Sequence, residues 1–276
     1  MSDPSTLSMK GSGTMRAEAK RLATFPGERL EFRAWPELGF QTEDVEWSGG
    51  GSPAGARGGS FRTSFDRAGS HTVRARCGDA SVEIVVSVCP IGDWMTEAAE
   101  FYGQSVDMDG VRVKTSRLVL GGSGSGFTCN QVIRFKRPRT EADLPSQSTL
   151  VHELGHVWEH QDGWAQLLRG FVEQIGKRLG RDPYDFGGPV GVAGATDLTT
   201  FRLESQAQII QELWRARHGA EADARENAFT TDYVEDLQRL VDGAGIGTRA
   251  PRGRTLASTI DGVVAWIVNV VVDFGV

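Results

Sequence analysis

The sequence predicts an α+β protein whose strands come first and whose helices follow. Between residues 21 and 90, apolar and polar residues alternate in several short segments, which glycine-rich and proline-containing turns separate. Beyond residue 147, apolar residues recur instead at helical spacing over longer segments. A run of strands followed by a run of helices is typical of α+β folds.

The first part of the chain is expected to form a small β-sandwich. Residues 1–20 are rich in Ser, Gly and Lys and are expected to be a flexible lead-in to it. Several short strands joined by Gly/Pro turns over residues 21–90 favour a sandwich. The expected strands are Arg29–Ala34, Asp44–Trp47, Ser60–Phe65, His71–Arg76 and Val82–Val88. The last two flank Cys77-Gly78-Asp79, which is a hairpin signal.

A second domain is expected over residues 91–250, because the composition changes at Pro90. Its expected elements are a helix at Trp94–Tyr102, strands at Val111–Leu120 and Phe127–Phe135, a loop at Gly180–Val192, and helices at Trp164–Leu179, Leu198–Arg217 and Ala220–Val241. Residues 251–276 are expected to be a linker and an apolar segment, for which core packing is favoured over partner docking.

Composition excludes some classes of function. The chain has 276 residues and a net charge of −6 with no dense basic patch, which argues against nucleic-acid binding. Three cysteines without paired spacing argue against a disulfide framework and for a reducing compartment. The N-terminus lacks the apolar core of a signal peptide, and the run Val263–Val272 is too short to span a bilayer. We therefore expect a cytoplasmic protein in the producing cell, without a transmembrane segment.

Residues 149–160 read TLVHELGHVWEH and contain the motif His-Glu-x-x-His at His152, Glu153 and His156. On a helix, histidines four residues apart lie on one face and can bind one metal ion. Glu153 can then reach a water on the metal without being a ligand. Zinc suits such a site, because it takes nitrogen and oxygen ligands and keeps one position open. The alternative is a core helix whose histidines are hydrogen-bonded.

A catalytic zinc needs a third protein ligand. His160 lies eight residues beyond His152, about 12 Å along a helix, which is too far for the same ion. Glu204 is the favoured candidate, because it lies at the edge of an apolar helical stripe and a buried carboxylate there needs a cation. Asp162 and Asp197 remain weaker candidates.

Three motifs in order, HELGHVW, DPYDF and ExQAxII, resemble the zincin-type metallopeptidase domains found as C-terminal extensions of type VI secretion spike proteins and in related toxin-associated proteins. The resemblance covers roughly residues 91–217. It implies zinc ligands at His152, His156 and Glu204, with Glu153 as the catalytic base. Tyr184 matches a loop tyrosine and is the favoured donor to the oxyanion, with His218 and Tyr233 as alternatives.

The chain departs from that family in two ways. A β module stands in front of it, and the segment FDRAGSHTVRARC in that module resembles the closing hairpin of bacterial immunoglobulin-like modules. Gln208 stands where many glutamate-ligand zincins carry an acidic residue. The hydrogen bonding that would orient the metal ligands from this position is therefore in question.

The resulting hypothesis is a zinc metallopeptidase, a bacterial effector or toxin exported without a signal peptide. Its substrate would be a peptide, a protein or a peptidoglycan peptide. A secretion apparatus or an immunity protein is a candidate partner. The alternatives are a non-catalytic, zinc-containing binding or delivery module, and a metal-free interaction protein in which the β module is the working part.

Overall fold

The computed structural model has a mixed α+β fold, as the sequence predicts. It describes residues 15–36, 41–117, 119, 124–164, 184–219 and 229–253. The chain divides into two units. The first comprises Met1–Asp93 together with Arg137–Leu144, and the second comprises Trp94–Lys136 together with Pro145–Val276.

Two β-sheets build the first unit. One has the strand order β1-β3-β6, and the other has the order β2-β8-β7-β4-β5. Their strands are β1 Met15–Ala19, β2 Ala23–Thr24, β3 Leu30–Pro36, β4 Glu46–Gly49, β5 Gly55–Arg57, β6 Ser60–Thr63, β7 Gly69–Cys77 and β8 Ala80–Val88. All neighbours pair antiparallel except β2 and β8, which are parallel. The predicted hairpin is β7–β8, with Gly78 at φ +58° in its turn.

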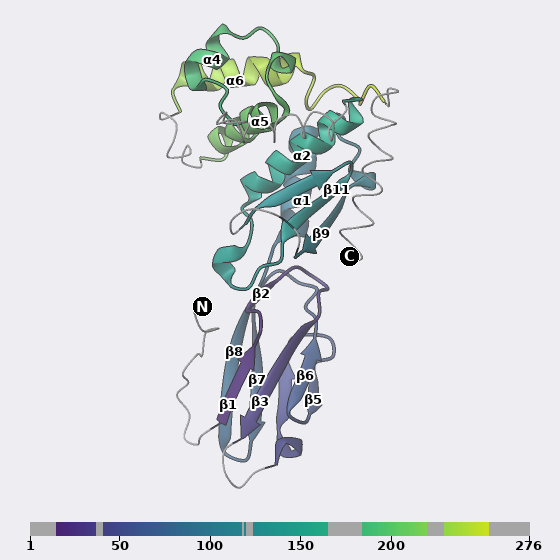
Figure 1. The fold of residues 1–276 in the computed structure, drawn as a ribbon, viewed down its shortest axis with the longest axis vertical. Coiled ribbons are helices and arrows are strands. Elements are labelled where there is room, and N and C mark those ends of the chain that lie inside the picture. The colour runs from purple at the N-terminus through teal and green to yellow at the C-terminus, as the bar shows by residue number, and fades with distance from the viewer. Residues whose placement is uncertain are drawn as a thin grey trace. The chain divides into compact units, whose positions relative to one another are not determined.

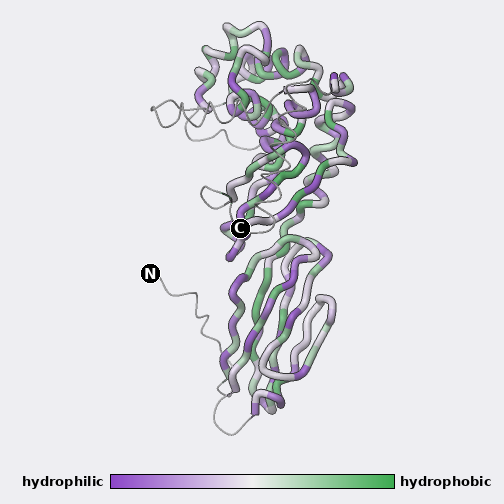
Figure 2. The backbone as a smooth tube through the Cα atoms, turned by 45° about the vertical axis from the view of Figure 1, so that its right-hand side comes forward, coloured by the Kyte–Doolittle hydropathy of each residue, from purple (hydrophilic) through white to green (hydrophobic). Residues whose placement is uncertain are grey.

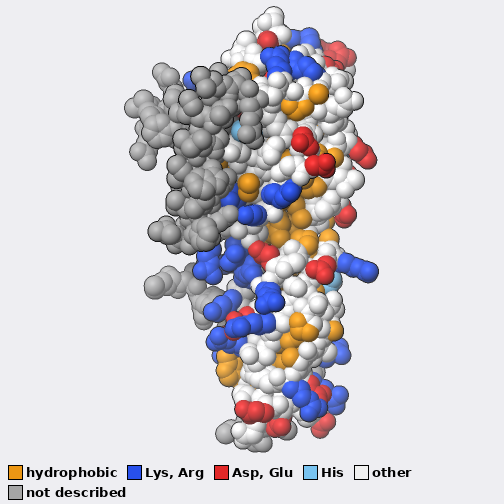
Figure 3. All heavy atoms as spheres, turned by 90° about the vertical axis from the view of Figure 1, so that its right-hand side faces the viewer, with side chains coloured by type: hydrophobic (Ala, Val, Ile, Leu, Met, Phe, Trp, Pro, Cys, Tyr) orange, Lys and Arg blue, Asp and Glu red, His pale blue; other side chains and the backbone are white. Residues whose placement is uncertain are grey.

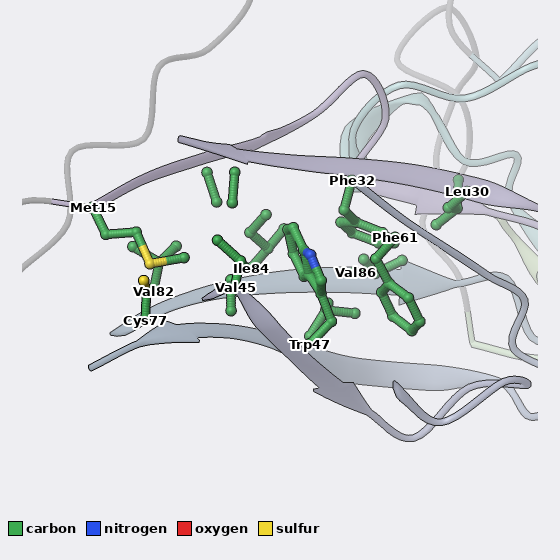
Figure 4. Close-up of a cluster of buried hydrophobic side chains, with 14 of the residues drawn as sticks. Met15, Leu30, Phe32, Val45, Trp47, Phe61, Cys77, Val82, Ile84 and Val86 are labelled. Carbon is green, nitrogen blue, oxygen red and sulfur yellow. The ribbon is translucent and has the colours of Figure 1, made fainter. Parts of the chain in front are cut away.

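The core of this unit is apolar and is shared by the two sheets. Alternate residues of β8 are buried, while the residues between them are exposed or half-buried. Hydrophilic and hydrophobic segments are interspersed along the strands of this unit in Figure 2. Phe32, Trp47 and Phe61 meet at the centre, with the Trp47 and Phe61 rings stacked 5.8 Å apart (Figure 4). The Trp47 indole N–H donates to Gly58 O at 2.8 Å, so its one polar group is satisfied.

Charged residues of the first unit lie on the outer faces of its strands, where they pair. Arg74 of β7 lies directly opposite Glu83 of β8 and pairs with it, and Arg62 of β6 pairs with Glu31 of β3 at 3.2 Å. Side chains of both signs are interspersed on the face drawn in Figure 3. Exposed pairs of this kind contribute at most about 1 kcal/mol each.

The second unit packs helices against a three-stranded sheet. The sheet has the order β10-β11-β9, with β11 antiparallel to β10 and parallel to β9. Strands β9 and β11 are labelled in Figure 1, together with helices α1, α2, α4, α5 and α6. Helix α2 contacts β10 and β11, α5 packs on α2, and α6 packs on α5 and α4. The elements are α1 Ile91–Tyr102, β9 Arg112–Ser116, β10 Gly126–Cys129, β11 Val132–Lys136, α2 Gln147–Gln161, α4 Gly188–Gly194, α5 Leu203–Arg217 and α6 Thr231–Gly243.

Several elements differ from the predicted ones. The strand expected at 127–135 is a hairpin of two strands, because Asn130 adopts φ +56° and turns the chain between them. Helix α4 occupies part of the expected loop at 180–192, and the helix expected from residue 198 begins at Leu203 after a short 3₁₀ turn, η4 (Leu198–Thr200). The helix expected at 164–179 and the segment 254–276 lie outside the described residues.

The chain also returns to the first unit where a continuous second domain was expected. Arg137–Leu144, between β11 and α2, belongs to the first unit. There the Leu22 amide donates to Arg139 O at 2.6 Å, and the Ser87 hydroxyl donates to Glu141 at 3.1 Å. Among the described residues, no helix has the length and apolar character needed to cross a bilayer.

Candidate metal centre

Helix α2 carries the motif and lies deep in the second unit. Its N-terminus is capped by Ser146, whose hydroxyl accepts from the Thr149 amide at 3.1 Å. From Leu150 to Gln161 every residue of the helix is buried, polar side chains included. The Tyr102 hydroxyl of α1 donates to Val151 O at 2.7 Å, which ties the helix to its neighbour.

Helix α5 brings Glu204 to the two histidines. Gly155 permits this approach, because a Cβ on it would lie 3.2 Å from both Cα and Cβ of Ala207 in α5. Glu204 lies in the first turn of α5, and its Oε2 is 3.3 Å from Nε2 of His152 and 3.3 Å from Nε2 of His156. The structure therefore brings together the three residues that the sequence predicts as metal ligands.

The donor set fits a zinc ion. One ligand atom from each of the three residues lies within 4.8 Å of the others, so the cluster could hold a metal ion. Two atoms that each lie about 2.1 Å from zinc at the tetrahedral angle are about 3.4 Å apart. The two nitrogen-to-oxygen separations of 3.3 Å match that spacing. Two imidazoles and one carboxylate are ligands that zinc accepts.

The charges of the cluster are mutually dependent. Burial alone would raise the pKa of Glu204, but the His156 charge and hydrogen bonds from both imidazoles hold that pKa well below its usual range. Burial alone would lower the pKa of His156, but Glu204 and Glu159 raise it well above its usual range. A buried group of carboxylates that favours positive charge in this way also favours a bound cation.

Glu153 faces β10 instead of joining the ligand cluster. Its side chain is 5% exposed, and Oε2 accepts from the Thr128 hydroxyl at 2.6 Å. Gly126 of the same strand packs against the carboxylate, because a Cβ there would collide with it. Burial raises the pKa of Glu153, while the two imidazoles and the Thr128 hydrogen bond partly oppose the shift. A carboxyl whose pKa is raised holds a proton more readily than an exposed one, which suits a group that accepts and returns a proton.

Glu159 is a site residue that motif reasoning missed. It lies three residues after His156 on α2, is fully buried, and accepts from His156 Nδ1 at 2.9 Å. Burial raises its pKa to about 7, although the neighbouring His156 charge opposes the shift. The signal in the sequence was a second glutamate in a helix predicted to be mostly buried, one turn beyond a candidate ligand.

Of the three candidate oxyanion donors, Tyr184 lies beside the cluster. Its ring is 6.0 Å from the His152 ring, and its side chain is 37% exposed. His218 stacks on Trp214 at the other end of α5, 14 residues after Glu204 and about 21 Å along the helix. Tyr233 is buried in α6, with its ring 6.1 Å from that of Phe229.

The other candidate ligands have different partners. Asp162 ends α2 and accepts from the Arg252 amide at 3.2 Å and from Arg249 at 3.4 Å. Asp197 caps the η4 turn by accepting from the Thr199 amide at 2.7 Å. Neither belongs to the metal-competent cluster, which within the described residues consists of His152, His156 and Glu204.

No protein-family model matches the chain, and no curated protein matches it significantly. A solved structure with detectable similarity is the crystal structure of domains 4 and 5 of the S-layer protein SbsC, at 16% identity over 27% of this chain. The similarity spans 50% of that S-layer chain with a TM-score of 0.21, which is too low to support an argument about fold or function.

Proposed function

We propose that the protein is a zinc-dependent metallopeptidase whose metal is held by His152, His156 and Glu204. The observation that carries the proposal is the convergence of two imidazoles and a carboxylate, with Glu153 on the same helix but outside the ligand set. A purely structural zinc site needs no general base, and the buried Glu153 carboxylate bonds to Thr128 instead of supporting a ligand histidine. This arrangement favours catalysis over the alternative of a non-catalytic zinc-containing module.

The residues of the chain divide the chemistry between them. A bound zinc supplies activation of water at neutral pH and polarisation of a carbonyl. Glu153 accepts the proton of the attacking water and passes it to the leaving amine. Thr128 holds Oε2 of that carboxylate, so Oε1, which takes no part in this hydrogen bond, is the proposed proton acceptor. The Tyr184 hydroxyl donates a hydrogen bond to the developing oxyanion.

The position of β10 favours an extended peptide as substrate. This strand is at an edge of its sheet, and it carries both Gly126 and Thr128, which contact Glu153. An added peptide strand would use backbone hydrogen bonds along β10 and bring its scissile bond beside the base. Proteins and peptidoglycan peptides both contain peptide bonds, so both are candidate substrates.

The proposal includes an immunoglobulin-like first unit and a zincin-like second unit. Two sheets around one apolar core support the assignment of the first unit. The assignment of the second unit is supported by helix α2, which carries the HExxH motif and packs against both the three-stranded sheet and helix α5. In this reading the β module docks or spaces the peptidase. A bacterial effector made in the cytoplasm and exported without a signal peptide, with a secretion apparatus or an immunity protein as partner, is the proposed context.

The test is hydrolysis by the Glu153→Gln variant. Wild type and variant, both loaded with one equivalent of zinc, are incubated with a library of unstructured peptides, and cleavage is followed by mass spectrometry. The variant keeps size and hydrogen bonding but cannot accept the proton, so we expect cleavage to fall by roughly two to four orders of magnitude. A wild type that cleaves no peptide would favour the binding module, and an equally active variant would overturn the mechanism.

A further inference from the structure

We propose that Glu159 is the positioning residue of the metal centre, holding the His156 imidazole with Nε2 directed at the metal. The inference rests on the zinc site of the proposed function. It assigns a role to a residue outside both the ligand set and the proposed catalytic pair.

The hydrogen bond fixes the state of the imidazole. Glu159 Oε2 lies 2.9 Å from His156 Nδ1, and a carboxylate can only accept there. The proton of the neutral ring therefore resides on Nδ1, which leaves the lone pair of Nε2 free for a metal. Nε2 is also the nitrogen that faces Glu204, at 3.3 Å. One contact thus sets both the tautomer and the orientation of this ligand.

Packing alone gives no reason for a carboxylate at this position. Glu159 is fully buried, and among the described residues its Oε1 has no hydrogen-bond partner. Burying a carboxylate without full compensation costs stability. Glu212 of α5 is equally buried, and its Oε1 accepts from Arg215 at 3.1 Å and from Gln208 at 3.0 Å, two side chains outside the metal cluster. The partner of Glu159 is instead a metal-ligand histidine, which indicates a role in the site.

Glu159 also explains how a ligand histidine can be supported although residue 208 is a glutamine. Gln208 occupies the position of α5 where an acidic residue was expected, and its side chain is bound to Glu212 and not to a ligand histidine. The supporting carboxylate comes from α2 itself, one turn beyond His156. Within the described residues, His152 Nδ1 has no hydrogen-bond partner, so the support is given to one of the two histidines.

The experiment measures zinc affinity and needs no substrate. Full-length wild type, Glu159→Gln, Glu159→Leu and the matched control Glu212→Gln are titrated with zinc against a competing chelator. Loss of such a supporting contact typically lowers metal affinity about 10- to 100-fold. We expect about 10-fold for Glu159→Gln, which keeps an acceptor, and up to about 100-fold for Glu159→Leu, which has none. Glu212→Gln should bind zinc like wild type.

Thermal unfolding of the metal-free proteins separates positioning from structure. Since Glu159 is an incompletely compensated buried charge, its replacement by Gln should leave the melting temperature of the metal-free protein unchanged or raise it. Weaker zinc binding without loss of metal-free stability supports the proposal. Wild-type affinity in both Glu159 variants, or an equal loss in Glu212→Gln, overturns it while the zinc site stands. A wild type that binds no zinc overturns the proposed function as well.

Discussion

The two units of the molecule differ in where their ionisable side chains lie. In the first unit, the sheets close around Phe32, Trp47 and other apolar side chains, and the arginines and glutamates pair on the outer faces. In the second unit, one helix buries His152, Glu153, His156 and Glu159 within eight residues. Because buried ionisable groups cost stability, we infer that the first unit is a scaffold and that the second carries the site.

The largest expected effect on stability lies in the first unit. Trp47→Ala removes a side chain that is 3% exposed, stacks on Phe61 and donates its indole N–H to Gly58 O. We expect the free energy of unfolding to fall by about 3–5 kcal/mol. Chemical denaturation measures the loss, and zinc titration provides the control. If the variant also loses zinc affinity while still folded, the division into scaffold and site is wrong.

Metal removal should act on the second unit. A ligand that binds only the folded state stabilises it by about 2.7 kcal/mol at a free concentration 100 times its dissociation constant. Adding a strong chelator to the zinc-loaded protein should therefore lower the melting temperature, and zinc should restore it. Ellipticity from the helices should report this shift. An unfolding curve that chelator leaves unchanged would contradict a metal-linked second unit.

Gly126→Ala should disturb the base and spare the metal. The added Cβ would collide with the Glu153 carboxylate, and a misplacement of about 1 Å can cost about 100-fold in rate. We expect peptide cleavage to fall by up to that factor while zinc stoichiometry stays the same. Gly92→Ala, where nothing lies within 4 Å of an added Cβ, is the matched control. Loss of zinc from Gly126→Ala would show that β10 supports the ligands too.

The smallest expected effect is at the surface of the first unit. Arg74→Ala breaks an exposed cross-strand pair with Glu83, and such pairs contribute about 0–1 kcal/mol. Denaturation should detect a loss no larger than that, and it should shrink further at high salt. A loss of several kcal/mol would mean that the charges of this unit are as important to folding as its core.

Local patterns predicted the elements that depend on local physics. The β7–β8 hairpin follows from alternation around a glycine turn, and the metal cluster follows from helical spacing with a carboxylate on a second apolar helix. Two features depend on contacts that are distant in sequence. The packing of Arg137–Leu144 into the first unit requires the hydrogen bond to Leu22, and the role of Glu159 requires its burial beside His156. A period or a spacing alone does not show either contact.

Zinc content should distinguish the roles of the two glutamates, when Glu153→Gln is compared with Glu204→Ala. Both variants remove one carboxylate, but only Glu204 belongs to the ligand cluster. After purification and dialysis against trace zinc, elemental analysis should find about one zinc per chain in wild type and in Glu153→Gln. Glu204→Ala should retain far less. Full occupancy in Glu204→Ala, or no stoichiometric zinc in wild type, would contradict the assignment of the metal centre.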